Sequence, residues 1–261
     1  MCKEEDRQMS QESKDLAAKA QKFSGKQVGN LLMNNMLIII MVVAAIGIAI
    51  YRPGFVAPSS LINILSLTAA YLPAALGIAG CIVLTGTDLS AGRCVGLTAC
   101  VSASLLQSVE ASNKMWPNIG TLPVWLVIII AMLIGACVGA FNGFFVGKFK
   151  LHPFIVTLGT QLILYTLLLL YVQMGNNGGG TIGSLDASYT DFVRAPLFSI
   201  PAANGASIPI PRYVLYSIIL AAIMWFIWNK TTFGKNMFAL GSNEEAARVS
   251  GVNVLVTTIL V

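Results

Sequence analysis

Six stretches of the chain contain no charged residue and no histidine, and they constrain the fold more than any other feature. They cover residues 36–51, 61–85, 95–109, 123–147, 153–174 and 213–229. A helix needs about 20 residues to cross a hydrocarbon core about 30 Å thick, so the stretches 36–51 and 95–109 must draw on their polar flanks. Strands of a membrane barrel alternate polar and apolar residues, which the run 37–46 does not. The pattern therefore predicts an all-α, polytopic membrane helix bundle with about six complete transmembrane helices.

Composition excludes several other classes of protein. Only 10% of the 261 residues are charged and 56% are hydrophobic, whereas soluble domains carry about 25% charged residues. The apolar excess opposes disorder, and 5 cysteines are too few for a disulfide scaffold. No Cys-x-x-Cys pair occurs and there is a single histidine, so we expect no metal site and no cofactor.

The positions of the basic residues predict the orientation in the membrane. If the N-terminus is cytoplasmic, twelve of the 16 Lys and Arg residues lie on its side and four lie on the other, as the positive-inside rule requires. No basic groove with interleaved aromatic residues appears, so we expect no nucleic-acid partner. The expected parts are a cytoplasmic tail at 1–35, a transmembrane helix bundle at 36–229, a cytoplasmic loop at 230–251 and the start of a truncated transmembrane helix at 252–261.

The longest connection between apolar stretches runs from Gly175 to Arg212, outside the cytoplasm in this orientation. It begins with several glycines and later contains four prolines. A loop of this length without secondary structure is usually functional or disordered. Docking of an external partner and a flexible connector are both compatible with it.

Four glycines in the fourth apolar stretch follow one another at intervals of four residues. They are Gly135, Gly139, Gly143 and Gly147. On a helix this spacing makes a bare stripe that lets another helix approach closely in lipid, so we predict a helix-packing seam.

Uncharged polar side chains occur at membrane depth in several stretches. Thr157, Thr160 and Gln161 share one face of the helix expected after Pro153. Asn142 is the one strongly polar group of its stretch, and it either bonds across helices or faces a polar route. Together with Gln107, these groups suit a neutral polyhydroxylated solute better than an ion, and we predict that the five line a substrate route.

The apolar pattern breaks between Leu84 and Arg93, where two glycines and three hydroxyl residues occur. Asp88 and Ser90 are good N-caps for a following helix. Irregular backbone at membrane depth is tolerated only against protein or water. The segment is therefore either an ordinary capped turn or an element shielded from lipid.

The polar loop near the end of the chain contains a short helix pattern between Ser242 and Gly251. Ser242 and Glu245 have the spacing of a capping box, Arg248 falls in the last turn, and Gly251 sits where a C-cap glycine belongs. Such a helix is too short to span a membrane. It is either a rigid surface for a partner or a plain amphipathic connector.

The chain has no motif for ATP hydrolysis or ion coupling. Gly147-Lys148 and Gly234-Lys235 both lack the residues that complete a Walker A sequence. No ionisable residue lies within an apolar stretch, although gradient-coupled carriers place such residues there. We therefore expect a transport protein that is not itself an enzyme.

At these motifs the sequence resembles the membrane permeases of bacterial ABC-type sugar importers of the ribose/galactoside class, with the galactoside members closest. The resemblance rests on residues 84–97, 141–143, 153–160 and 228–251. It covers almost everything after the first apolar stretch. It implies a multi-pass inner-membrane permease for a neutral monosaccharide, with galactose or methyl galactoside as the expected substrate.

The resemblance also implies partners and residue roles. Family permeases pair with a second permease subunit, a cytoplasmic ATPase subunit and a periplasmic sugar-binding protein. The segment that matches the ATPase-coupling helix contains Ser242, Asn243, Glu244, Glu245, Ala246, Ala247, Arg248 and Gly251. The segment that matches a family motif of the early transmembrane core contains Thr87, Asp88, Leu89, Ser90 and Gly92.

Family permeases continue through several more spans, whereas this chain stops at Val261 within an apolar run that would start a seventh helix. We therefore expect the front part of a longer permease subunit. Two alternatives remain: a nonfunctional or regulatory fragment of such a permease, and a gradient-driven carrier without an ATPase.

Overall fold

The computed structural model describes residues 33–201 and 207–261. The chain divides into two compact units, Met1–Leu61 and Ile62–Val261, and the boundary falls in the first turn of α4. The described part of the first unit holds α3 (Met36–Tyr51), η1 (Pro53–Val56) and the start of α4 (Pro58–Val83). The second unit continues with α5 (Ala91–Leu105), α6 (Val124–Phe149), α7 (Pro153–Gln173), α8 (Ala187–Arg194), β1 (Pro196–Pro201), β2 (Ser207–Pro211), α9 (Arg212–Lys230), α10 (Thr232–Ser242), α11 (Glu244–Val249) and α12 (Val254–Leu260).

The prediction of an all-α membrane bundle is confirmed. Within the described residues, α4, α6, α7 and α9 are long and apolar enough to cross a membrane, and α3 and α5 are shorter apolar helices. Each of the six apolar stretches forms one of these helices. The third differs most from expectation, because its helix starts at Ala91 and ends at Leu105, several residues earlier than the uncharged run.

In the first unit, α3 buries none of its side chains. Leu37 is 72% exposed and Ile50 is 77% exposed. The helix ends at Tyr51, before Pro53, which disfavours helical backbone in the residue that precedes it. An apolar helix without a polar face suits a lipid environment.

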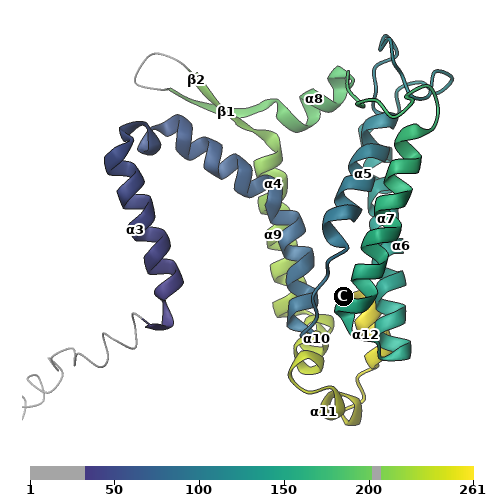
Figure 1. The fold of residues 1–261 in the computed structure, drawn as a ribbon. Helices are drawn as coiled ribbons and strands as arrows, with labels where there is room; N and C mark the ends of the chain where they lie inside the picture. Colours follow the sequence, from purple (N-terminus) through teal and green to yellow (C-terminus); the bar gives the residue numbers. More distant parts are fainter. Residues whose placement is uncertain (1–32, 202–206) are drawn as a thin grey trace, which may run out of the picture. The chain divides into compact units, whose positions relative to one another are not determined.

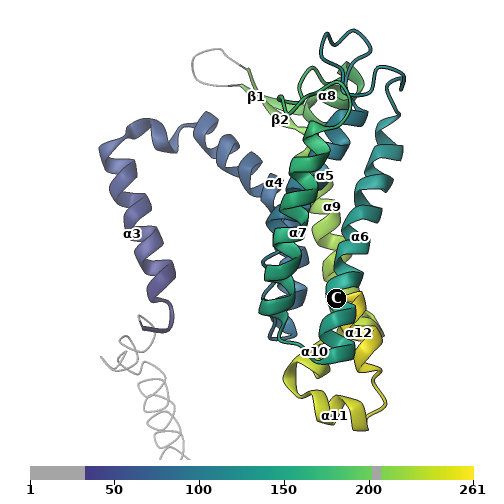
Figure 2. The same cartoon turned by 45° about the vertical axis from the view of Figure 1, so that its right-hand side comes forward.

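In the second unit, α5, α6 and α7 pack against one another, and α12 packs along α6 (Figure 1). Helices α10, α11 and α12 gather at one end of the unit, whereas α8 and the antiparallel β1-β2 hairpin lie at the other (Figure 2). Helix α9 connects the two ends and contacts α10. The arrangement therefore gives the unit two chemically different ends joined by apolar helices.

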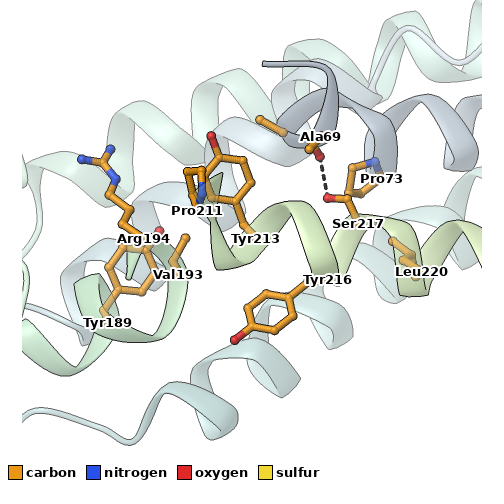
Figure 3. Close-up of a pocket in the computed structure, with 11 residues that line it drawn as sticks. Ala69, Pro73, Tyr189, Val193, Arg194, Pro211, Tyr213, Tyr216, Ser217 and Leu220 are labelled. Atoms are coloured by element: carbon orange, nitrogen blue, oxygen red, sulfur yellow. Dashed lines mark hydrogen bonds between the residues drawn. The ribbon is translucent and has the colours of Figure 1, made fainter. Parts of the chain in front are cut away.

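A proline inside α4 explains one contact between α4 and α9. Pro73 has no N–H, so the carbonyl oxygen of Ala69 loses its donor in the helix. The hydroxyl of Ser217 on α9 donates to this oxygen at 2.6 Å, as Figure 3 shows. Ser217 is buried, and Ile62, Ala69, Ile210 and Val214 form a small apolar core beside it. A polar group of one helix thus completes the backbone of its neighbour.

Replacing Ser217 by alanine should lower the free energy of unfolding by about 1–3 kcal/mol, because it leaves a buried carbonyl oxygen without a donor. The thermal unfolding of the purified protein in detergent measures this change. Thr68→Ala is the matched control, since the Thr68 hydroxyl is exposed and donates to a carbonyl of its own helix. Equal unfolding midpoints for the two variants would contradict the role given to Ser217.

The long connection from Gly175 to Arg212, expected as a loop, contains regular structure. Asp186 caps α8 by accepting a hydrogen bond from the Ser188 N–H at 2.9 Å. Hydrogen bonds from the Ser188 hydroxyl and N–H hold the pKa of Asp186 below its ordinary value. The hairpin follows, with an irregularity in its register between Pro196 and Phe198. Four prolines belong to these two strands, and because proline disfavours strand pairing the hairpin was not predicted from the sequence.

Candidate functional site

A cavity of about 780 Å³ lies among α4, α5, α6, α12 and the loops that join them in the second unit. We call it the polar cavity. Its lining combines small apolar residues with hydroxyl, amide and carboxylate groups. The polar lining residues from the membrane helices and the loop after α4 are Thr85, Thr87, Asp88, Ser90, Thr98, Asn142, Thr157 and Thr258.

A chain of hydrogen bonds runs along one side of the polar cavity. The Thr160 hydroxyl of α7 donates to Asn142 Oδ1 of α6 at 2.6 Å, and Asn142 Nδ2 donates to Ser90 Oγ at 2.9 Å. Ser90 Oγ donates in turn to Asp88 Oδ1 at 2.7 Å. Thr160, Asn142 and Ser90 are all buried. Four side chains from three separate parts of the sequence therefore form one connected network.

Helix α7 holds the same region by a second set of contacts. We call residues 84–90 the Asp88 segment. Thr157 Oγ1 accepts a hydrogen bond from the Leu89 N–H and lies 3.2 Å from both this nitrogen and the Thr87 carbonyl oxygen. Within the segment, Thr85 has a φ of 57°. The segment is thus irregular backbone packed on protein, as the second of the two sequence interpretations proposed.

Ser90 is the N-cap residue of α5, as expected, but its side chain makes no capping bond. Ser90 has helical backbone angles, and its hydroxyl donates to Asp88. Asp88 Oδ1 instead accepts from the Ser90 N–H at 2.8 Å. Asp88 therefore orders the entry into α5 from two residues upstream. Gly92, the last residue of the predicted motif, has open space where a Cβ would lie.

The structure separates the five residues predicted to line a substrate route. Asn142 and Thr157 line the polar cavity, and Thr160 lies behind Asn142 as its hydrogen-bond donor. Gln161 is half-buried and is not among the lining residues.

Gln107 lies elsewhere, in the loop that follows α5. It is fully buried, accepts from the Met115 N–H at 2.9 Å and donates to the Gly183 carbonyl oxygen at 3.2 Å. Both of its amide atoms are therefore used in tying two loops together. It is not among the residues that line the polar cavity, because α5 ends at Leu105 and leaves Gln107 outside the helix.

Thr85, Thr98 and Thr258 line the polar cavity but were missed. Each is a threonine in or beside an apolar run. Thr98 donates to the Cys94 carbonyl oxygen of its own helix, so its sequence position alone does not distinguish it from a packing residue.

The glycine stripe of α6 meets two different environments. A Cβ on Gly143 would lie 2.7 Å from Ile259 Cα, and one on Gly147 would lie 2.9 Å from Leu255 Cδ1, so α12 packs directly on this half of the stripe. A Cβ on Gly135 or Gly139 would meet nothing within 4 Å, although all four glycines line the polar cavity. One half of the stripe serves close packing and the other half leaves space.

The short polar helix α11 starts one residue later than the capping box predicted. Ser242 ends α10, and its hydroxyl donates to the Phe238 carbonyl oxygen. Asn243 has extended backbone and is the N-cap, with Oδ1 accepting from the Ala246 N–H at 3.0 Å. Ser242 cannot cap α11 because it belongs to the preceding helix.

The C-terminal end of α11 follows the prediction. Gly251 has a φ of 85°, a conformation that glycine adopts without strain. The Gly251 N–H donates to the Arg248 carbonyl oxygen and the Val252 N–H to that of Ala247, which together make a Schellman motif. Both ends of α11 are therefore capped, and the segment is stiff for its length.

The two glutamates of α11 differ in their surroundings. Glu244 Oε1 lies 2.6 Å from Arg248 Nη2 and 3.4 Å from Lys150 Nζ. Lys150 is the residue that directly follows α6. Glu245 has a 73% exposed side chain, and Val249, one turn later, is 89% exposed. Ala247 is buried. One face of α11 thus packs on the unit while Glu245 and Val249 face outward.

A second cavity, of about 720 Å³, lies at the hairpin end of the second unit. Figure 3 shows Tyr189 and Arg194 of α8 on one side of it and Tyr213 and Tyr216 of α9 on another. The Tyr216 hydroxyl donates to the Phe192 carbonyl oxygen, which fixes that ring against α8. This cavity is more apolar than the first and contains none of the predicted site residues.

Comparison with known proteins identifies related chains. The family described as "Branched-chain amino acid transport system / permease component" matches residues 60–261. The galactose/methyl galactoside import permease protein MglC of Salmonella typhimurium is 42% identical over 224 residues, covering 86% of this chain and 64% of that protein. MglC of Escherichia coli is 43% identical, covering 83% and 62%.

A more distant relative is named for a different sugar. The ribose import permease protein RbsC of Haemophilus influenzae is 31% identical over 232 residues, covering 88% of this chain and 64% of that protein. The chain spans less than two thirds of the length of these relatives. No solved structure matches the chain.

Proposed function

The chain belongs to the permease-component family of transport systems, and we propose that it forms part of a permease subunit of an ATP-driven importer for a neutral monosaccharide. The names of its relatives favour galactose or methyl galactoside as the substrate. The family is one of membrane permease components, which agrees with the prediction that the chain is not itself an enzyme.

The observation that carries the proposal is the chemistry of the polar cavity. Its volume of about 780 Å³ falls within the range of small-molecule sites. Asp88, Lys150 and Glu244 line the cavity from the loops and α11, whereas the membrane helices contribute neutral hydroxyl and amide groups, such as Thr98, Asn142 and Thr258. These groups donate and accept hydrogen bonds, as sugar hydroxyls do, without the cost of burying a charge.

The proposed orientation places the α10–α12 end in the cytoplasm. Lys148, Lys150 and Lys235 lie at or near this end, and the positive-inside rule assigns such residues to the cytoplasmic side. The hairpin end would then face the periplasm, where a sugar-binding protein would dock. A second permease subunit would complete the transporter in the inner membrane.

We assign ATPase coupling to α11. The helix is capped at both ends, and it presents Glu245 and Val249 to a partner while Ala247 anchors it. A nucleotide-dependent change in the partner would move α11 if the partner binds it differently in its two states. ATP hydrolysis therefore belongs to the partner subunit.

Replacing Glu245 by arginine together with Gly251 by valine should abolish sugar-stimulated ATP hydrolysis in the complete transporter. The first change reverses an outward-facing charge, and the second strains a backbone with positive φ. Co-purification of the ATPase and ATP hydrolysis in proteoliposomes are the measurements, with a loss of about tenfold or more expected for a coupling of this kind.

Glu110→Arg is the control for that variant. Glu110 is an exposed acid in the loop between α5 and α6, far from α11 in the sequence and at the other end of α5 from the Asp88 segment. The substitution reverses a glutamate charge, as Glu245→Arg does, but it leaves the proposed coupling surface unchanged. Sugar-stimulated hydrolysis that persists in the double variant would remove α11 from the mechanism.

A further inference from the structure

The end of α10 lies against the end of α4 at Gly241, with no room between them for a side chain. A Cβ on Gly241 would lie 2.0 Å from the Val83 carbonyl oxygen and 2.9 Å from the Val83 carbonyl carbon. No side chain fits in this space, and the obstacle is main chain, which cannot rotate away as a side chain can. Figures 1 and 2 both show α10 at this end of α4. Gly241 is therefore the position that lets α10 press directly on α4.

On the α4 side, the contact leads straight into the Asp88 segment. Val83 is the last residue of α4, and the segment begins at the next residue. The Thr85 N–H donates to the Ile82 carbonyl oxygen and the Gly86 N–H to that of Cys81, so the start of the Asp88 segment is tied to the last turn of α4 and moves with it. At the far end of the segment, Ser90 and Leu89 are tied to α6 and α7 by hydrogen bonds to Asn142 and Thr157. The segment thus lies between a fixed end and an end that α10 contacts.

On the α10 side, the contact is close to α11. Gly241 precedes the N-cap of α11, Asn243, by two residues. The only residue between them, Ser242, is held in α10 by its hydrogen bond to Phe238. A displacement of α11 would therefore carry Gly241 with it. Close-packed protein transmits displacement because it is hardly compressible.

We propose that the contact between Gly241 and Val83 passes movement of α11 to the Asp88 segment and so changes the polar cavity. The proposal rests on the proposed function, in which an ATPase moves α11. Gly241 also lines the polar cavity, and here it acts as a positioning residue through its contact with Val83. The Asp88 segment is the moving wall of the cavity, and the hydrogen-bond chain to Thr160 is the anchor against which it moves.

Two native cysteines report on this movement. Cys81 precedes the Asp88 segment, Cys94 follows it, and both line the polar cavity. The experiment uses the complete transporter with its ATPase, with Cys2, Cys100 and Cys137 replaced by serine. The rate at which a water-soluble maleimide modifies Cys81 and Cys94 is measured with and without ATP. In the otherwise native protein we expect ATP to change the rate by about fivefold or more.

Gly241→Ala should abolish the effect of ATP on labelling while the ATPase still co-purifies. Gly159→Ala is the matched control, because a Cβ on Gly159 of α7 meets nothing within 4 Å, and it should keep the full effect. A Gly241→Ala transporter that keeps the effect of ATP would overturn the proposal. Absence of the effect in the native protein would instead count against the proposed function itself.

A second pair of variants covers the case in which Gly241→Ala does not assemble. Both variants keep the native Gly241 and the Val83 carbonyl group that it contacts. Glycine at position 83 loosens the end of α4, whereas alanine keeps that end helical. We expect the labelling change to be reduced in Val83→Gly and retained in Val83→Ala. Equal labelling changes in the two variants would show that the end of α4 does not transmit the movement.

Discussion

Replacing Asn142 by leucine should destabilise the protein more than any other single exchange of a polar side chain discussed above. Asn142 is 7% exposed, and its amide both accepts from Thr160 and donates to Ser90. Leucine has a similar size, but it takes the acceptor from the buried Thr160 hydroxyl and one donor from the buried Ser90 hydroxyl, which keeps its bond to Asp88. Since each such loss costs about 1–3 kcal/mol, we expect the free energy of unfolding to fall by about 2–5 kcal/mol. Thermal unfolding in detergent measures the effect.

The same variant should also lose transport in the complete importer, because Ser90 and Asp88 would no longer be held against α6. The matched control is Thr166→Val on α7, whose exposed hydroxyl donates only to the Leu162 carbonyl oxygen of its own helix. Sugar uptake by vesicles separates the two variants. If Asn142→Leu unfolded at the same temperature as Thr166→Val, the hydrogen-bond chain would not contribute to the stability of the fold.

Asn142 also shows what the sequence could and could not predict. It stands alone as a strong polar group within an apolar run, and in lipid such a group needs a partner on another element. That much follows from the sequence. Its partners, Ser90 and Thr160, are 52 and 18 residues away. Only the packing of α5 and α7 on α6 determines that these hydroxyl groups face it.

The helices themselves were predictable because the absence of charge is a strong and local signal. Their ends were less so. The uncharged run at 95–109 suggested that Gln107 lies within a span, but Asp88 and Ser90 start the helix earlier and it ends at Leu105. An uncharged run has no feature that marks where a helix leaves the membrane. Gln107 was therefore placed within a helix that ends two residues before it.

The short helix α11 was likewise predictable as an element, whereas its first residue was not. The sequence predicted a short capped helix with Gly251 at its end, and the Schellman motif confirms that glycine. The N-cap moved from Ser242 to Asn243 because α10 continues up to Ser242. Ser and Asn are both favourable N-cap residues, so either Ser242 or Asn243 could cap α11. The length of the preceding helix decides between them.

Replacing Gly143 by valine should release α12 from α6. A Cβ at this position would lie 2.7 Å from Ile259 Cα and 2.9 Å from the Thr258 carbonyl oxygen, both backbone atoms of the neighbouring helix. Overpacking of this kind costs about 1–3 kcal/mol or more, and local opening of α12 would absorb it. Hydrogen exchange of the amides in residues 254–261 should accelerate by about tenfold for each 1.4 kcal/mol lost.

Gly139→Val is the control for that exchange, since it adds the same side chain one turn earlier, where a Cβ meets nothing within 4 Å. It should leave hydrogen exchange in α12 unchanged although it narrows the polar cavity. The two glycines are indistinguishable in the sequence stripe, so a difference between the two variants would come from the placement of α12 alone. Equal exchange rates would mean that α12 does not rest on Gly143.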